Sequence, residues 1–546
     1  MENILLEYKN GKIKTNLKVE NIERFFIFPS KIYNQQLYTT SSDKPFKNED
    51  IQFINYDLKK QRVMIKNSWY GEYPLFYYYD KVMDLIFIDY NLIELVKTIQ
   101  KNHIKLELDR TAFFEECIID NPLRDRTLFK NVYKCMAGEE IYFDLKKFEV
   151  RKERVFKLQF NSNNSEKNEE SYLRDAKDIL RSLLDKYEEE LLHCQEEDIL
   201  IPLSGGYDSR LLVSLAKRKG FSFNSLVFGP SHSNEITVAK KVASELKLNL
   251  SFEELLNSYY KKYGKEVVEL TGGLSSPMHC HLHSIMQEKQ ILPKYIIHGF
   301  LGGEFAGANQ TKIAKNFSMT KEEAVEDVIN RRFKGHTLWT QIGTKEKEEI
   351  INDVEKIAED CCQVNFPCHL DEYIRNVDRQ NSLIANIFAP LERSSKIIRP
   401  FASKDYAKFF NGLPYELREN RYLYKKAALS LFPKAFDIPD QKLPSNVPIP
   451  KKLQPKARKL FLGAFVLSYL VSKGKIQIGK SMVYEKHHEL LDNELKDVLN
   501  KSIEFSTDYT GIDFYKYAKP SYVRFKETLV PFRLITLYYL QDYFRS

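Results

Sequence analysis

Several features that would place a chain of this length in a special class are missing from the sequence. None of the seven cysteines stands in a Cys-x-x-Cys pair, so a zinc site is not expected. The longest apolar run, Leu460–Val471, is too short to cross a bilayer. The first residues show no signal-peptide pattern. The sequence therefore predicts a cytoplasmic protein that makes no use of a membrane.

A strong excess of one charge is missing as well. The chain has 83 basic and 75 acidic residues, mixed along its length, and a formal net charge of only +8 over 546 residues. Nucleic-acid binding usually requires a basic surface, so we expect no nucleic-acid partner. The length predicts two or three domains, with enough apolar residues for real cores.

The most informative stretch begins with the apolar run Ile199–Leu203, which predicts a buried parallel strand. The run stops at Ser204-Gly205-Gly206, and a helical pattern follows from Ser209. A strand, a small-residue loop and a helix N-terminus together bind phosphate through backbone N–H groups. Ser204 and Ser209 can add hydroxyl donors, and Asp208 could hold Mg²⁺. The alternative is a glycine-rich turn without function.

This segment, Ser204-Gly205-Gly206-Tyr207-Asp208-Ser209, resembles the pyrophosphate loop of the ATP pyrophosphatases, which transfer AMP to an oxygen and release pyrophosphate. A second predicted strand, Ser222–Phe228, and a helix, Glu235–Leu246, follow it. The order strand, helix, strand, helix predicts a parallel, doubly wound sheet with its ligand at the carboxyl ends of the strands. The resemblance implies that Val227 and Phe228 hold adenine through their backbone.

Residues 1–155 show short strands separated by polar turns. The segments Gly71–Tyr78 and Leu85–Asp89 are similar to a signature of glutamine amidotransferase domains, and Arg126–Val132 and Ala137–Ile141 match the end of such domains. The resemblance implies an αββα sandwich of the N-terminal-nucleophile type.

The glutaminase nucleophile of that family is a cysteine that removal of the initiator Met exposes, and the free α-amine serves as its base. Here the second residue is Glu2, and the first cysteine is Cys117. We therefore expect a glutaminase fold without glutaminase activity and with a structural role. The same loss occurs in β-lactam synthetases and lasso-peptide cyclases, which use an amine other than ammonia released from glutamine.

A second glycine-rich segment, His298–Gly307, follows another predicted strand. It is similar to the Ser-Gly-Glu-Gly-(Ser/Ala)-Asp-Glu loop of asparagine synthetases. The catalytic Glu of that family falls on Phe300, and its second Mg²⁺-binding Asp falls on Gly303, with Glu304 next to it. The resemblance implies that the loop still binds phosphate and that its acid–base function has changed. Either Glu304 reaches the metal, or the site holds a single ion.

Two further positions come from the same resemblance. Lys442 falls on the active-site lysine that neutralises the leaving pyrophosphate, and Glu392 is a candidate acid–base partner. Between the glycine-rich loops, His279, His281 and His283 stand at two-residue spacing, which would suit metal ligands on a strand. On a helix, one of them would instead line the substrate pocket.

The predicted fold class is α/β. The chain is divided into a glutaminase-like sandwich (1–155), a polar linker (156–170), an asparagine synthetase-like ATP-pyrophosphatase domain (171–445) and a helical C-terminal extension (446–546). From the end of the linker into the second domain, the stretch from Glu169 to about Gln195 predicts one long amphipathic helix.

The predicted function is ATP-dependent adenylation of a carboxylate, followed by amide-bond formation with an amine. The predicted cofactors are ATP and Mg²⁺. The candidate catalytic residues are Lys442, Glu304 and Glu392, and the candidate metal ligands are Asp208 and Glu304. The candidate nucleotide-binding residues are Ser204, Gly205, Gly206, Asp208, Ser209, Val227, Phe228, Gly299 and Gly302.

Peptide macrolactam formation and amidation in natural-product or polysaccharide biosynthesis are the leading substrate options. They imply a precursor peptide and companion biosynthetic enzymes as partners, and a homodimer is compatible with the sequence. Two other classes stay open, a nucleotide-binding pseudoenzyme and a nucleic-acid-modifying ATP pyrophosphatase.

Overall fold

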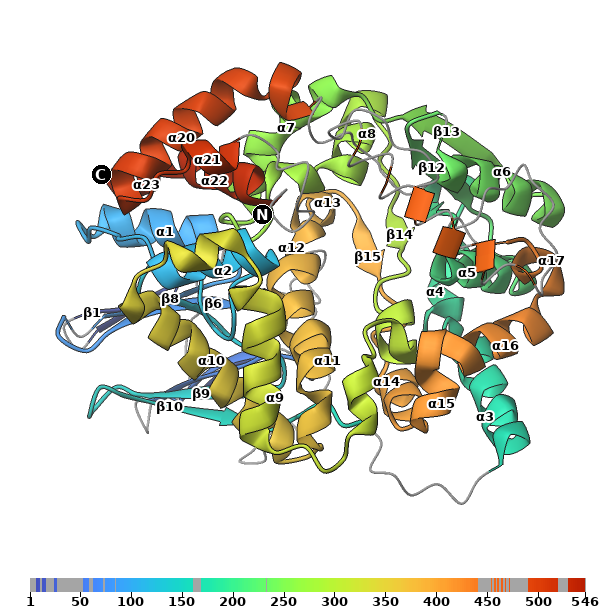
Figure 1. Cartoon of the computed structure of the whole chain (residues 1–546), viewed down its shortest axis with the longest axis horizontal. Coiled ribbons are helices and arrows are strands. Elements are labelled where there is room, and N and C mark those ends of the chain that lie inside the picture. Colours follow the sequence, from blue (N-terminus) through green and yellow to red (C-terminus); the bar gives the residue numbers. More distant parts are fainter. Residues whose placement is uncertain are drawn as a thin grey trace.

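The computed structural model describes residues 62–71, 74–83, 85–160, 168–231, 233–439, 490–517 and 529–544 with their side chains. It also gives the backbone of four short strands between residues 6 and 57, and of scattered residues between 453 and 471. Figure 1 shows a sheet-containing half on each side of a group of helices. In the described part of the chain, no helix combines the length and apolar character needed to cross a membrane.

One half is built on a five-stranded parallel sheet. Its strands lie in the order β13-β12-β11-β14-β15. Their bounds are β11 (Ile199–Pro202), β12 (Asn224–Gly229), β13 (Leu250–Glu254), β14 (Tyr295–Ile297) and β15 (Lys396–Ile398). The strand order reverses between β11 and β14, which creates a crevice at the carboxyl ends of these two strands. The predicted parallel α/β sheet is confirmed.

Helices along this half connect and cover the strands. They are α3 (Glu169–Ser182), α4 (Glu188–Leu191), α5 (Tyr207–Arg218), α6 (Asn234–Leu246), α7 (Asn257–Leu270), α8 (His281–Lys289), α14 (Lys404–Asn411), α15 (Tyr415–Arg418), α16 (Tyr422–Leu431) and α17 (Pro433–Phe436). Because both faces of the sheet are covered, Ile199, Leu200 and Ile201 of β11 are all buried instead of alternating.

The prediction of one long helix from Glu169 to about Gln195 was wrong, because the structure has two shorter helices there. Helix α3 ends at Ser182, and a short 3₁₀ turn, Asp185–Tyr187, separates it from α4. Leu183 and Leu184 at the break are buried. The apolar spacing continues across this break, so periodicity alone could not locate it.

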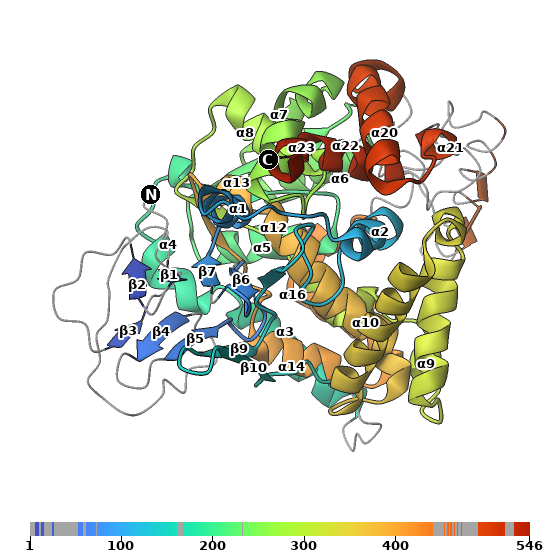
Figure 2. The ribbon, with the colours of Figure 1, turned by 90° about the vertical axis from the view of Figure 1, so that its left-hand side faces the viewer.

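The other half contains two five-stranded antiparallel sheets, with the orders β2-β1-β7-β6-β8 and β10-β9-β5-β4-β3 (Figure 2). The strands are β1 (Leu6–Lys9), β2 (Lys12–Thr15), β3 (Arg24–Phe26), β4 (Phe53–Asp57), β5 (Arg62–Lys66), β6 (Phe76–Asp80), β7 (Leu85–Asp89), β8 (Val132–Lys134), β9 (Glu139–Asp144) and β10 (Glu149–Arg154).

The two antiparallel sheets share one apolar core. Ile65 of β5 and Phe143 of β9 lie in the same buried cluster as Tyr77 of β6 and Ile88 of β7, and the rings of Tyr77 and Phe143 are 5.6 Å apart. Helix α1 (Leu92–Lys101) packs on β6 and β7. Stacked antiparallel sheets agree with the predicted sandwich, but the N-terminal-nucleophile class itself stays a prediction. The position of Glu2 lies outside the described residues.

A helical insertion between β14 and β15 lies between the two halves (Figure 1). It comprises α9 (Lys321–Val328), α10 (Thr344–Cys362), α11 (Leu370–Ile374), η10 (Arg375–Ile384), α12 (Ala385–Ile387) and α13 (Ala389–Glu392). Helix α10 packs against α2 (Arg110–Ile119) of the N-terminal half.

The C-terminal helices α20 (Lys496–Thr510), α21 (Tyr515–Ala518), α22 (Leu529–Tyr539) and α23 (Gln541–Arg545) pack on both halves (Figures 1 and 2). The centre of this contact is Arg533, whose side chain is fully buried. Its guanidinium donates to Glu116 Oε2 at 3.1 Å and Asp120 Oδ1 at 3.0 Å in the N-terminal half. It also donates to the carbonyl oxygen of Gly273 at 3.0 Å. One buried cation therefore joins three distant parts of the chain.

We expect Arg533→Met to lower the free energy of unfolding by about 3–5 kcal/mol, because it leaves the buried Glu116 carboxylate without its cation. Urea unfolding followed by circular dichroism would measure this loss. Arg151→Met is the matched control, since its exposed pair with Glu153 on β10 should contribute less than about 0.5 kcal/mol. Equal, small effects of the two substitutions would contradict a central role for Arg533.

Candidate functional site

Two glycine-rich loops meet at the carboxyl ends of β11 and β14, where the strand order reverses. The first, Ser204–Gly206, leads from β11 into α5, and the second, Gly299–Gly303, leads from β14 into the helical turn η5 (Glu304–Ala308). A Cβ atom on Gly302 would lie 2.7 Å from Cγ of Asp208, and one on Gly299 would lie 3.1 Å from its Cβ. The second loop can therefore approach Asp208 this closely only because these residues lack side chains.

Within the first loop, two hydroxyls and the backbone form a compact hydrogen-bonded turn. The N–H of Ser204 donates to Ser209 Oγ at 3.1 Å, the two serine Oγ atoms are 3.0 Å apart, and the N–H of Gly206 donates to Ser204 Oγ at 3.1 Å. Helix α5 begins at Tyr207, two residues before the predicted start, and no side chain caps it. Its first-turn N–H groups point out of the helix N-terminus, which is the arrangement that binds phosphate.

Asp208 stands between the two loops. The hydroxyl of Tyr424 donates to its Oδ1 at 2.8 Å, and the N–H of Gly303 hydrogen-bonds to the same carboxylate. Burial raises the pKa of Asp208, and the positive charge of Arg421 opposes this rise. The pKa of Glu304 is also raised, first by burial and then by the charge of Asp208. The structure therefore brings the two predicted metal ligands within electrostatic reach of each other.

Arg421 belongs to this site, and sequence reasoning missed it. Its charge acts on both Asp208 and Glu304, and its guanidinium lies 5.4 Å from the ring centre of Tyr207. Asn420 and Arg421 both have left-handed backbones, with φ of 54° and 60°. Asn420 tolerates the left-handed conformation, but no sequence pattern predicts a left-handed turn at these two residues.

Arg210 is a second residue that sequence reasoning missed. It is fully buried, and its guanidinium donates to the carbonyl oxygen of Gly205 at 2.9 Å. It also donates to the carbonyl oxygens of Ala435, Ile438 and Pro439 at 3.1, 2.7 and 3.0 Å. The sequence did contain one signal for Arg210. It places a charged residue directly before Leu211 and Leu212, on the face of the predicted helix that should be buried. Lys442 follows this anchored segment but lies outside the described residues.

Phe300, where the sequence resemblance predicts a catalytic Glu, is buried in an aromatic cluster. Its ring centre lies 5.4 Å from that of Phe388 and 6.2 Å from that of Tyr70, which belongs to the N-terminal half. Tyr70 also contacts Phe305 at 5.3 Å and donates a hydrogen bond to the carbonyl oxygen of Asn376 at 2.7 Å. The N-terminal half therefore supports the second glycine-rich loop directly.

Glu392 forms a buried ion pair with Arg399, which follows β15. The guanidinium of Arg399 lies 4.8 Å from the ring centre of Phe388. This pairing accounts for Glu392 structurally, and an acid–base role for it stays a prediction. His298, which follows β14, packs against the same ring at 4.7 Å from Phe388, and burial lowers its pKa to about 4.

Val227 and Phe228 lie in β12, where they pair with Phe252 and Glu253 of β13. Their proposed backbone contacts with adenine stay a prediction. The three histidines between the loops do not converge. His279 accepts the N–H of Ser276 at 3.1 Å, whereas His283 lies 3.3 Å from Glu266. In the described ranges, no three His, Cys, Asp or Glu side chains are grouped to hold a metal.

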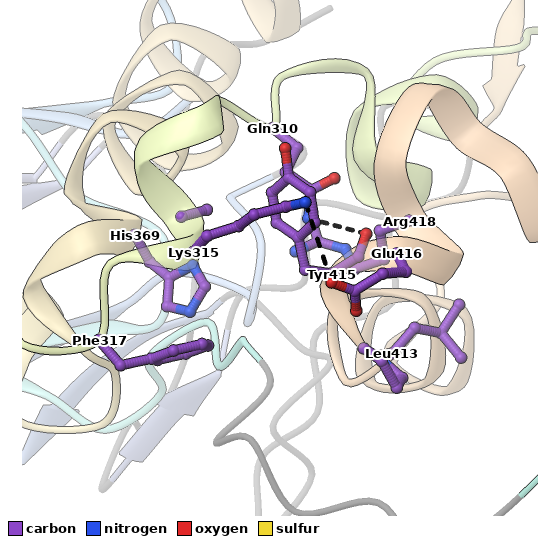
Figure 3. A pocket seen from close by; sticks show the side chains of 10 residues that line it. Gln310, Lys315, Phe317, His369, Leu413, Tyr415, Glu416 and Arg418 are labelled. Atoms are coloured by element: carbon purple, nitrogen blue, oxygen red, sulfur yellow. Dashed lines mark hydrogen bonds and ion pairs between the residues drawn. The ribbon is translucent and has the colours of Figure 1, made fainter.

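A cavity of about 310 Å³ lies at the far end of η5 from Glu304 (Figure 3). Lys315 reaches across it toward Glu416, and Gln310 donates to the carbonyl oxygen of Tyr415. Its main charges are already compensated, because Lys315 lies 4.0 Å from Glu416 and the buried Arg418 is paired with Glu372. The cavity is therefore polar without an excess of either charge.

Comparison with known proteins adds little. No protein-family model matches the chain, and no curated protein sequence matches it. Among solved structures, it is similar to the NH3-dependent NAD synthetase from Campylobacter jejuni subsp. jejuni NCTC 11168 in complex with the nitrate ion. That match covers 36% of this chain and 96% of the other, at 16% identity and a TM-score of 0.18. This score is too low to support a conclusion, so the interpretation depends on the geometry of the site.

If the glycines set the approach of the two loops, Gly302→Ala should weaken binding of inorganic pyrophosphate by about tenfold or more, because its Cβ would overlap Asp208. Gly299→Ala is the graded comparison, since its Cβ would be 3.1 Å rather than 2.7 Å from the nearest Asp208 atom, and it should weaken binding less. Isothermal titration calorimetry on variants with unchanged thermal midpoints would measure both. Wild-type affinity in Gly302→Ala would contradict the arrangement.

Proposed function

We propose that this chain is an ATP-dependent, AMP-forming ligase that adenylates a carboxylate and then joins it to an amine. The observation that carries the proposal is the convergence at Asp208 of two glycine-rich loops, one of which has paired serine hydroxyls and an uncapped helix N-terminus. The site lies at the strand-order reversal of a parallel sheet, where such sheets bind their ligands.

In this proposal, the first loop holds the pyrophosphate moiety of ATP. The proposed donors are the N–H of Gly205, the first-turn N–H groups of α5 and the hydroxyls of Ser204 and Ser209. The N–H of Gly206 can join them only by giving up its hydrogen bond to Ser204 Oγ. The exchange of hydrogen bonds between the two serines fixes their hydroxyls beside the loop before the nucleotide arrives, which reduces the ordering that binding must impose. Gly299 and Gly302 let the second loop lie directly against Asp208, which places it beside the proposed phosphate position.

Asp208 and Glu304 fit one Mg²⁺, because this ion is commonly bound by one or two carboxylates together with substrate phosphates and waters. The ion, when bound, would offset the negative charge that develops on the leaving pyrophosphate. The hydrogen bonds from Tyr424 and Gly303 hold the Asp208 carboxylate in one orientation.

The proposed reaction has two steps. A carboxylate oxygen of the substrate bonds to the α-phosphorus of ATP as the bond from this phosphorus to the β-phosphate oxygen breaks, which gives an acyl-adenylate and pyrophosphate. The amine nitrogen then bonds to the acyl carbon, AMP leaves, and the amine loses a proton. The enzyme contributes positioning and charge neutralisation.

Lys442 is proposed to neutralise the transition state of the first step. Arg210 supports this role, because it anchors residues 435–439 to the carbonyl oxygen of Gly205 in the first loop. Lys442 follows Pro439 by three residues, which span at most about 10 Å.

The substrates are proposed by chemistry alone. Phe300 has no ionisable group where the resemblance places a catalytic Glu, so the amine's proton must leave by another route. The proposed pair is a peptide or other natural-product carboxylate and an amine that does not come from glutamine, with a precursor peptide and companion enzymes as partners. A nucleotide-binding pseudoenzyme is the second candidate, and Phe300 with its aromatic neighbours favours it.

Wild-type protein should bind α,β-methylene ATP saturably with Mg²⁺, and Asp208→Asn should lose most of the Mg²⁺-dependent part of the affinity because a neutral amide is a poor Mg²⁺ ligand. Calorimetric titration at several Mg²⁺ concentrations would measure this dependence. Absence of binding by folded wild-type protein would refute the nucleotide site in both candidates.

Lys442→Met separates the two candidates. For a ligase, it should keep binding of the analogue within a few-fold of wild type and abolish AMP release when ATP is supplied with a panel of peptide carboxylates. Chromatography that resolves AMP from ADP gives the readout. Nucleotide binding without AMP from any carboxylate in the panel would favour the pseudoenzyme.

A further inference from the structure

The phosphate site contains a protein cation at the place where the resemblance expects a second metal ligand. A Cβ atom on Gly303 would lie 3.3 Å from Nη1 of Arg421 and 3.3 Å from Oδ2 of Asp208. The guanidinium and the carboxylate therefore flank the same point, beside the N–H of Gly303. The charges of Arg379 and Arg421 both act on Glu304, and that of Arg421 acts on Asp208 as well.

Space explains the glycine at 303 better than backbone conformation does. Gly303 has φ of −73° and ψ of −38°, which any residue can adopt. A side chain there would have to share the 3.3 Å gaps with Arg421 and Asp208. An aspartate would also add a third negative charge next to Asp208. The missing side chain thus leaves room for the guanidinium of Arg421.

The backbone at Arg421 has an unusual conformation, which sets the position of this side chain. Asn420 and Arg421 are two consecutive non-glycine residues in the left-handed region, immediately before α16. Side chains other than glycine's are sterically disfavoured in this region, and such residues are commonly found at functional sites. On the preceding turn, the carbonyl of Arg418 lies against Gly307, whose φ of 104° only glycine adopts readily. The second glycine-rich loop and the turn at 420–421 are therefore fitted to each other.

We infer that Arg421 binds the pyrophosphate moiety of the nucleotide and supplies the positive charge that a second Mg²⁺ would otherwise supply. The site would then use one Mg²⁺, held by Asp208 and Glu304, and one fixed guanidinium. Arginine suits this task because its fork of donors matches phosphate oxygens and its charge persists at all physiological pH values. This inference rests on the proposed function and deepens it.

The decisive experiment exchanges the guanidinium for a metal ligand. Arg421→Met should weaken binding of α,β-methylene ATP by roughly tenfold to a hundredfold, the range for a lost charge-assisted hydrogen bond to phosphate, and should weaken AMP binding much less. The double variant Gly303→Asp/Arg421→Met should regain part of the affinity and depend more steeply on Mg²⁺. Calorimetry at stepped Mg²⁺ concentrations would measure both effects.

Mn²⁺, counted by electron paramagnetic resonance in the presence of the analogue, provides a readout independent of activity. Wild type should bind one Mn²⁺ per nucleotide, and the double variant should bind two. Lys426→Met is the matched control, because this cation in α16 pairs with Glu169 and should leave nucleotide binding unchanged. Arg421→Lys should restore part of the affinity lost in Arg421→Met.

The outcomes separate the two levels of the proposal. If wild type binds no nucleotide, the proposed function fails and this inference fails with it. If wild type binds the analogue and Arg421→Met binds it equally well, only the inference is overturned. Two Mn²⁺ ions per nucleotide in wild type would also overturn the inference while leaving the proposed function intact.

Discussion

The close contact between Asp208 and the second glycine-rich loop is the constraint on which the rest of the site depends. It requires Gly299 and Gly302 to lack side chains, since added Cβ atoms would fall 3.1 and 2.7 Å from Asp208. It also brings Glu304 and Arg421 into electrostatic reach of Asp208. Without this contact, the crevice at the strand reversal would contain separate loops and no concentrated charge.

The other parts of the chain hold these two loops in place. Tyr70 packs on Phe300 of the second loop and on Phe305 just after it, so the N-terminal half stabilises the site from outside the crevice. Arg533 fastens the C-terminal helices to both halves. Arg210 fastens the chain before Lys442 to the first loop. Three arginine- or tyrosine-centred contacts thus connect distant segments around one crevice.

The contacts of Tyr70 give the N-terminal half a supporting role at the site. Removal of Tyr70 would expose the aromatic cluster around Phe300 and leave the carbonyl oxygen of Asn376 without its donor. A buried carbonyl that loses its hydrogen bond destabilises its surroundings by about 1–3 kcal/mol. The N-terminal half therefore stabilises the second glycine-rich loop and the chain around Asn376.

The sequence by itself determined the parallel sheet and the first loop, because a short apolar run, two glycines and a following helical pattern are local features. It also located the second loop and the substitution of Phe300, and Glu304 could be selected from its neighbourhood. Only the tertiary structure decided that Arg210 and Arg421 belong to the site. Their contacts join segments more than 200 residues apart, and a left-handed turn at two non-glycine residues leaves no periodicity or composition by which a sequence could reveal it.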